Sequence, residues 1–142
     1  MSYIKLTFLV GLVFIFSSCS GTGTKDLGLI LPQIEEKPDN KVFITNQTGH
    51  TFLMSDTVVF LNGKSVGILG VNEILIGQGR DGKNTLKLEG KSDVFMVDSN
   101  TYTFENKNKE NRFFIVNVNQ KFINRVPILN EVTQQSFISN VR

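Results

Sequence analysis

Residues 58–69 read VVFLNGKSVGIL, two apolar segments joined by Asn62-Gly63. An Asn-Gly pair between two such segments is the strongest short-range signal for a β-hairpin, because both residues accept the positive φ of a tight turn. The Val, Ile and Phe residues on either side are typical of strands. This stretch therefore predicts two antiparallel strands and favours an all-β fold.

Further strand patterns lie on either side of this hairpin. In Thr85–Glu89 the side chains alternate, which places Leu86 and Leu88 on one face. Arg112–Val118 (RFFIVNV) is apolar on both faces, as is typical of a central strand or of a strand between two layers. The other strands that we expect are 42–45, 51–54, 57–61, 65–69, 73–76, 93–98 and 101–105, with a second hairpin turn at 99–100.

Closely spaced strands without a convincing amphipathic helix between them are typical of an antiparallel sandwich or a small barrel. At the C-terminus, Asn130 is a candidate cap for a short helix over Glu131–Asn140, just after Pro127 ends the preceding strand. The length of 142 residues and a hydrophobic fraction of 40% fit one domain with a real core. We expect an all-β antiparallel β-sandwich over 41–142, with this short helix at its end.

The composition excludes several function classes. The formal net charge is only +2, and the 15 Lys and Arg residues are scattered, so no electrostatic footprint for nucleic acid is present. One Cys and one His allow no disulfide within the chain and leave little for a transition-metal site. We expect no cofactor, no metal and no nucleic-acid partner.

The N-terminus has the features of an export signal. Lys5 precedes an apolar run from Leu6 to Phe16, and Ser17, Ser18 and Cys19 follow. This order of a charged start, an apolar segment and small residues is that of a signal peptide. The apolar run is shorter than the roughly 20 residues that a membrane-spanning helix needs. Residues 1–18 are therefore expected to be removed rather than to belong to the fold.

Phe16-Ser17-Ser18-Cys19 resembles the lipobox of bacterial lipoproteins. The resemblance implies that Cys19 carries lipid on its sulfur and becomes the acylated (palmitate-bearing) N-terminus. An ordinary cleaved signal with a chance cysteine, or an uncleaved anchor, is the alternative. Ser20 stands where such lipoproteins often carry Asp for retention in the inner membrane, so the resemblance favours the periplasmic face of the outer membrane.

Residues 19–40 are expected to be the lipidated cysteine and a flexible tether. Ser20–Lys25 (SGTGTK) has the composition of a linker, and a charged, proline-bearing segment ends the stretch at Asn40. The apolar residues Leu27–Leu31 lie between them. The sequence leaves open whether these residues belong to the tether or dock on the domain.

Residues 77–84 (GQGRDGKN) fit two phosphate-binding patterns, the dinucleotide fingerprint and the P-loop with Asn84 in place of Ser or Thr. Both motifs require a helix directly after the glycines, whose N-terminus faces the phosphate. Here Thr85–Glu89 alternates like a strand instead. We therefore interpret the segment as a hairpin loop in which Gly supplies positive φ.

Other candidate residues are weak. His50 lies in an expected turn without a neighbouring nucleophile, and carboxylates such as those of Asp93 and Asp98 flank a strand. The chain has 12 Phe but no Trp and only two Tyr, which favours core packing over an aromatic binding platform. We expect no catalytic residues.

The Val58–Leu69 hairpin and the Gly82–Leu88 segment are similar to those of small bacterial lipoprotein domains of unknown function. This resemblance covers about Lys41 to Pro127 and implies an immunoglobulin- or transthyretin-like β-sandwich. It implies no catalytic residue.

These features favour a lipid-anchored, non-enzymatic module that contacts an envelope protein. The candidate contact loops are Gln78–Asn84 and Asn106–Asn111, whose basic residues favour an acidic partner or an anionic glycan: Arg80, Lys83, Lys107 and Lys109. The alternative is a small-ligand or glycan binder with a Phe-lined pocket. An enzyme of the cell wall or lipid surface is disfavoured, because one His and a cysteine committed to lipid leave few catalytic groups.

Overall fold

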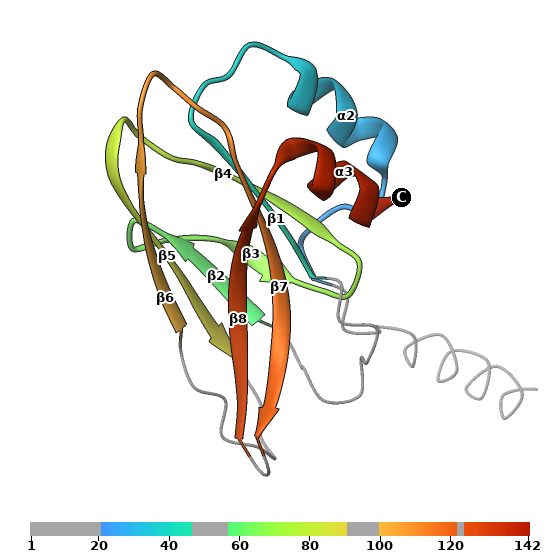
Figure 1. Ribbon diagram of the computed structural model, residues 1–142. Coiled ribbons are helices and arrows are strands. Elements are labelled where there is room, and N and C mark those ends of the chain that lie inside the picture. Colours follow the sequence, from blue (N-terminus) through green and yellow to red (C-terminus); the bar gives the residue numbers. More distant parts are fainter. Residues whose placement is uncertain (1–20, 47–56, 91–99, 122–123) are drawn as a thin grey trace, which may run out of the picture.

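The computed structural model describes residues 21–46, 57–90, 100–121 and 124–142 (Figure 1). In chain order the elements are α2 (Leu27–Glu35), β1 (Lys41–Asn46), β2 (Thr57–Leu61), β3 (Lys64–Leu69), β4 (Ile74–Gln78), β5 (Gly82–Gly90), β6 (Asn100–Asn106), β7 (Arg112–Lys121), β8 (Asn124–Val132) and α3 (Gln134–Val141). The expected strands at 51–54 and 93–98 lie outside the described residues.

The strands form two four-stranded sheets, ordered β4-β1-β7-β8 and β3-β2-β5-β6. The expected all-β sandwich is confirmed. All strand pairs are antiparallel except β1 and β7, which run parallel. The main core lies between the sheets and is formed by apolar side chains from both: Val42, Ile44, Val59, Leu61, Leu69, Leu75, Leu86, Leu88, Phe104, Phe114, Val116 and Leu129.

The hairpin at 58–69 is confirmed. Leu61 pairs with Lys64 across the turn, and Asn62 and Gly63 have φ of 52° and 79°. These positive values are those of the tight turn that best follows the right-handed twist of the two strands. Leu86 and Leu88 are fully buried on one face of β5, as their alternation predicts.

Both faces of β7 are covered, as its sequence predicts. Phe114 and Val116 point into the core between the sheets, whereas Phe113 and Ile115 lie in a second apolar cluster on the outer face. The Phe43 and Phe113 rings stack there with their centroids 5.1 Å apart. Two helices, α2 and α3, cover this outer face, so the molecule has a third layer on one side (Figure 1).

The prediction of a flexible tether over 19–40 is wrong for residues 21–40, the part that the structure describes. Leu27–Glu35 is a helix, and its apolar residues at intervals of three and four bury Ile30 and Ile34 at 1% and 3% exposure against the sheet. The Asp26 carboxylate caps the helix by accepting from the Gly28 N–H at 2.8 Å. The question left open by the sequence is thereby answered, because the 27–31 segment docks while Leu29 faces solvent.

The C-terminal helix exists, but its expected boundary is wrong. β8 continues to Val132 through Pro127, and Thr133 rather than Asn130 caps α3 by accepting from the Ser136 N–H at 3.2 Å. Proline is tolerated there because β8 is an edge strand of its sheet. α3 buries Phe137 completely against Phe43 and Phe113.

Candidate interaction surface at the loop end

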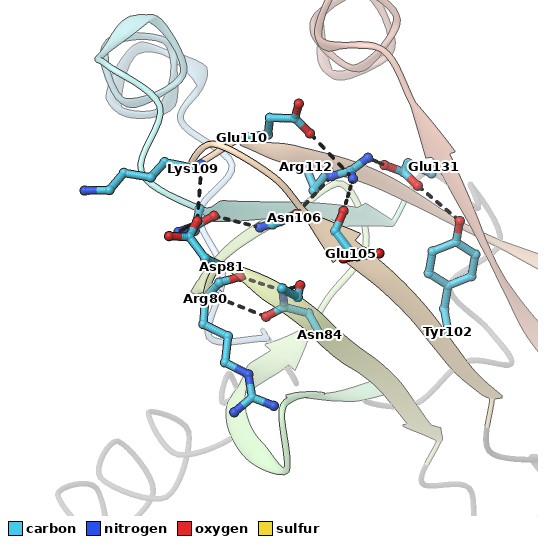
Figure 2. Close-up of polar contacts among 12 residues, drawn as sticks. Arg80, Asp81, Asn84, Tyr102, Glu105, Asn106, Lys109, Glu110, Arg112 and Glu131 are labelled. Carbon is cyan, nitrogen blue, oxygen red and sulfur yellow. Dashed lines mark hydrogen bonds and ion pairs between the residues drawn. The ribbon is translucent and has the colours of Figure 1, made fainter.

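Three connections meet at one end of the sandwich, which we call the loop end. They are residues 79–81 between β4 and β5, residues 107–111 between β6 and β7, and Asp39-Asn40 before β1. The first two overlap the contact loops expected from the sequence. Figure 2 shows the polar contacts that hold this end together.

Asp81 joins the two candidate loops. Its Oδ1 accepts from the backbone N–H of Lys109 at 3.2 Å and from Nδ2 of Asn40 at 3.1 Å. Asn40 in turn accepts from Nδ2 of Asn106 at 3.1 Å, and both asparagines are buried, at 6% and 2% exposure. Segments far apart in the chain are thus fixed side by side over a buried amide pair.

The side chain of Asn84 fixes the 79–81 loop through hydrogen bonds. Its Oδ1 accepts from the Arg80 N–H at 3.0 Å and from Asn62 Nδ2 at 2.8 Å. Its Nδ2 donates to the carbonyls of Arg80 and Gly82 at 2.7 and 2.9 Å. The side chain is completely buried with four partners, which makes it a structural clamp for the loop.

The structure also shows whether residues 77–84 have the geometry of a phosphate-binding motif. Gly77 and Gln78 end strand β4, Gly82 begins strand β5 with φ of 82°, and no helix follows. The positive φ expected for a glycine of this segment is confirmed at Gly82. The prediction of a hairpin loop is wrong, because β4 and β5 belong to different sheets. The segment is a crossover between the layers rather than a phosphate cradle.

Arg112 is the centre of a second polar cluster at this end. Its Nη1 donates to Glu131 at 2.6 Å and its Nε to Asn106 at 3.0 Å, while Nη2 contacts the Glu105 carbonyl and lies 3.6 Å from Glu110. The guanidinium also lies 5.9 Å from the centre of the Phe104 ring. With these partners Arg112 acts as a structural tie between strands.

Tyr102 of β6 adds a further contact between the two sheets to this cluster. Its hydroxyl donates to Glu131 Oε2 at 3.1 Å (Figure 2). Burial raises the pKa of Tyr102 above its ordinary value, the hydrogen bond to Glu131 and that carboxylate's charge raise it further, and Arg112 opposes the shift. The hydroxyl therefore serves as a hydrogen-bond donor rather than as a base.

All four basic residues expected at the contact loops are exposed. The Lys109 amine lies 3.9 Å from Asp39, and Arg80 Nε donates to the Lys83 carbonyl at 3.1 Å. Figure 2 shows the Arg80 and Lys109 side chains extending away from the polar network. Lys83 and Lys107 form no ion pair with any described residue.

The charge at this end is mixed rather than uniformly basic. Exposed acidic side chains lie among the four cations: Asp39, Asp81, Glu105 and Glu110. Sequence reasoning missed both these neighbours and the network below them. The recurring asparagines at the strand ends (Asn40, Asn84 and Asn106) are the signal that could have indicated it, because asparagine buried at such positions needs several partners.

The remaining candidates lie elsewhere. Cys19, His50, Asp93 and Asp98 are outside the described residues. Where the structure describes the chain, no three His, Cys, Asp or Glu side chains cluster as a metal site would require, and no helix is long and apolar enough to cross a membrane. Five Phe side chains are core residues, as expected: Phe43, Phe104, Phe113, Phe114 and Phe137.

Two shallow hollows border α3, and both are lined mainly by polar residues. One lies over Gln134, Gln135 and Ser139, the other over Lys25, Asn72 and Arg142. Neither has the aromatic lining that the alternative of a Phe-lined ligand pocket requires.

Comparison of the chain with protein-family models, curated proteins and solved structures finds no significant match. The similarity of the Val58–Leu69 hairpin to lipoprotein domains therefore stays a prediction from the sequence.

Proposed function

We propose that the protein is a lipid-anchored, non-enzymatic module of the bacterial envelope that binds a protein partner through its loop end. The anchoring part rests on the sequence alone, on the export signal of residues 1–18 and the cysteine that follows it. Lipid on Cys19 would hold the domain at a membrane surface, with the outer membrane favoured by Ser20.

The binding part rests on one observation. Asp81 and Asn40 fix the 79–81 and 107–111 loops against each other, so four exposed cations from separate parts of the chain lie at the same end of the sandwich. Binding to a surface that is already ordered avoids the entropy cost of arranging it. Its interspersed acidic and basic groups favour a protein partner with the complementary charge pattern over a uniformly acidic one.

The non-enzymatic part is supported by what the ionisable groups of this end do. Asp81, Arg112 and Glu131 each make the structural contacts given above. None is left poised beside a nucleophile, as a general acid or base would be.

The test is crosslinking and affinity co-purification from cells with the full chain. Lys83→Glu/Lys107→Glu reverses two loop-end charges that form no ion pair among the described residues. Lys37→Glu/Lys64→Glu makes the same charge change at two exposed residues outside the 79–81 and 107–111 loops and is the matched control. We expect the first variant to lose a protein partner that the wild type and the control retain, and Cys19→Ala to lose it through lack of anchoring.

Equal recovery with both double variants would contradict the role of the loop end. Recovery of only lipid or glycan with every form would contradict the protein-partner proposal and favour the ligand-binding alternative. Mass spectrometry of the purified wild type tests the anchor directly, since an unmodified Cys19 would contradict it.

A further inference from the structure

The segment that follows Cys19 is held on the domain by several hydrogen bonds. The Thr22 N–H donates to the Ile68 carbonyl at 2.8 Å, and Thr22 Oγ1 accepts from the Ile68 N–H at 2.9 Å. Thr24 and Ile74 exchange both backbone hydrogen bonds, at 2.8 and 3.0 Å. Thr22 and Thr24 therefore extend the sheet region at β3 and β4 rather than lead away from it.

A buried carboxylate secures the same segment. Glu73 is 3% exposed, and its Oε2 accepts from the backbone N–H groups of Gly23 and Gly70 at 3.2 and 3.1 Å. A Cβ atom at Gly21 would lie 2.1 Å from this oxygen and 2.4 Å from the Gly70 nitrogen. Gly21 thus fits only because it has no side chain, and the segment is packed from its first described residue.

From this arrangement, and resting on the proposed lipidation of Cys19, we infer that the domain sits directly against the lipid headgroups, with the 70–73 turn toward the bilayer and the loop end away from it. Cys19 and Gly21 are two residues apart, so extended chain between them reaches at most about 7 Å. That reach is too short to lift the domain off the surface in which Cys19 is anchored.

The loop end is then presented to the aqueous side. β1 begins beside Asn40 at the loop end and ends at Asn46, whose carbonyl accepts from the Asn72 N–H at 2.8 Å. Six residues of strand separate the two ends by roughly 15–20 Å. β4 connects the same two ends, from Ile74 beside Thr24 to Gln78, whose Nε2 donates to the Asp39 carbonyl at 2.6 Å.

The surface beside the anchored segment suits anionic headgroups. Lys25 and Arg142 are exposed, lie around one hollow with Asn72, and form no ion pair with the described residues. Cations near a bilayer are attracted to its negative surface potential. The occupant of this face is therefore the bilayer that holds the acyl chains.

The test uses the chain's own lysines. The full-length protein is purified from bacterial membranes, checked for acyl mass on Cys19, and inserted into vesicles of phosphatidylethanolamine with a minority of phosphatidylglycerol. A water-soluble amine-acetylating reagent is applied, and the rates at Lys25 and Lys107 are compared by mass spectrometry. Both side chains are exposed in the domain, so the ratio within one molecule reports shielding by the bilayer.

We expect Lys25 to react severalfold more slowly than Lys107 on vesicles. Insertion of a Gly-Ser linker of about 20 residues between Ser20 and Gly21, which lengthens the reach by roughly 25 Å, should abolish most of the difference. Equal rates in the wild-type protein carrying acyl mass would overturn the seating while leaving the anchor intact. Absence of acyl mass would overturn the proposed anchoring, and with it the seating that rests on it.

Discussion

Single asparagines decide how the loop end is built. Asparagine near a turn is usually exposed to solvent. The side chain of Asn84 is instead buried, and its amide has four hydrogen-bond partners. The oxygen and nitrogen of the amide satisfy partly buried backbone and side-chain groups. Its value to the fold is therefore the cost of leaving those groups unpaired, which is larger than the net gain of forming the bonds.

Replacing this amide should destabilise the protein strongly. Asn84→Ala leaves the Arg80 and Gly82 carbonyls without their partner, and we expect the free energy of unfolding to fall by about 2–3 kcal/mol. Urea unfolding followed by circular dichroism measures the change. Asn130→Ala, at an exposed position in β8, is the control and should stay within about 0.5 kcal/mol of wild type. A similar effect of both substitutions would contradict the clamp.

At the scale of elements, the least expected feature is α2. Its Pro32 and Gly28 weaken the helical pattern, and a nine-residue helix is marginal in isolation. It is stable here because Ile30 and Ile34 join the outer apolar cluster on the sheet. The covering of that face, in turn, explains why β1 and β7 can be apolar on both sides.

The docking of α2 predicts a sharp contrast between two of its residues. Ile34→Ala should lower the free energy of unfolding by about 2–4 kcal/mol, because it removes a buried side chain from the cluster. Leu29→Ala changes a side chain that is 61% exposed and should cost no more than about 0.5 kcal/mol. If Ile34→Ala proved as mild as Leu29→Ala in thermal unfolding, the segment would be a tether after all.

At the scale of the whole molecule, the Tyr102–Glu131–Arg112 cluster ties the two sheets together. Tyr102 belongs to β6 in one sheet, and Glu131 and Arg112 belong to β8 and β7 in the other. Arg112 also reaches the first sheet through Asn106 and the Glu105 carbonyl. The Tyr102 part of the tie depends on the protonated hydroxyl, because only this form can donate to the carboxylate.

This tie predicts a loss of stability at alkaline pH. The folded state raises the pKa of Tyr102 above its ordinary value of 10.0, so its contribution to stability is present below pH 10 and is lost as the pH rises through the folded-state pKa. Tyr102→Phe should lower the free energy of unfolding at neutral pH and show a smaller further decrease above pH 10. Urea unfolding at a series of pH values measures both slopes, and identical slopes would contradict the tie.

The sequence predicted well those features that depend on neighbours in the chain. The Asn62-Gly63 turn follows from the φ values that these two residues accept, and the alternation of β5 follows from the period of a strand. The boundaries of helices and strands were predicted less well from the sequence. β8 continues to Val132, and α3 follows Thr133, because β8 pairs with β7 as far as Phe113. No local pattern in the sequence indicates this pairing.

The candidate surface was predicted in part. The sequence predicts exposed loop positions for Arg80, Lys83, Lys107 and Lys109, and all four are exposed. Lys83, however, lies in strand β5 rather than in a loop. The mixed charge and the buried amides beneath could not be predicted, because they require knowing which loops meet. The contact of Asp81 with Lys109 spans 28 residues of sequence.

By itself the sequence determined the fold class, the hairpin at 58–69 and the doubly buried character of β7, since each follows from local backbone preference or from periodicity. Only the tertiary structure decided the parallel pairing of β1 with β7, the docking of Leu27–Glu35 and the capture of Gly21–Thr24 by Glu73. These features are contacts between distant segments, and their free energy exists only once the chain has brought the two partners together.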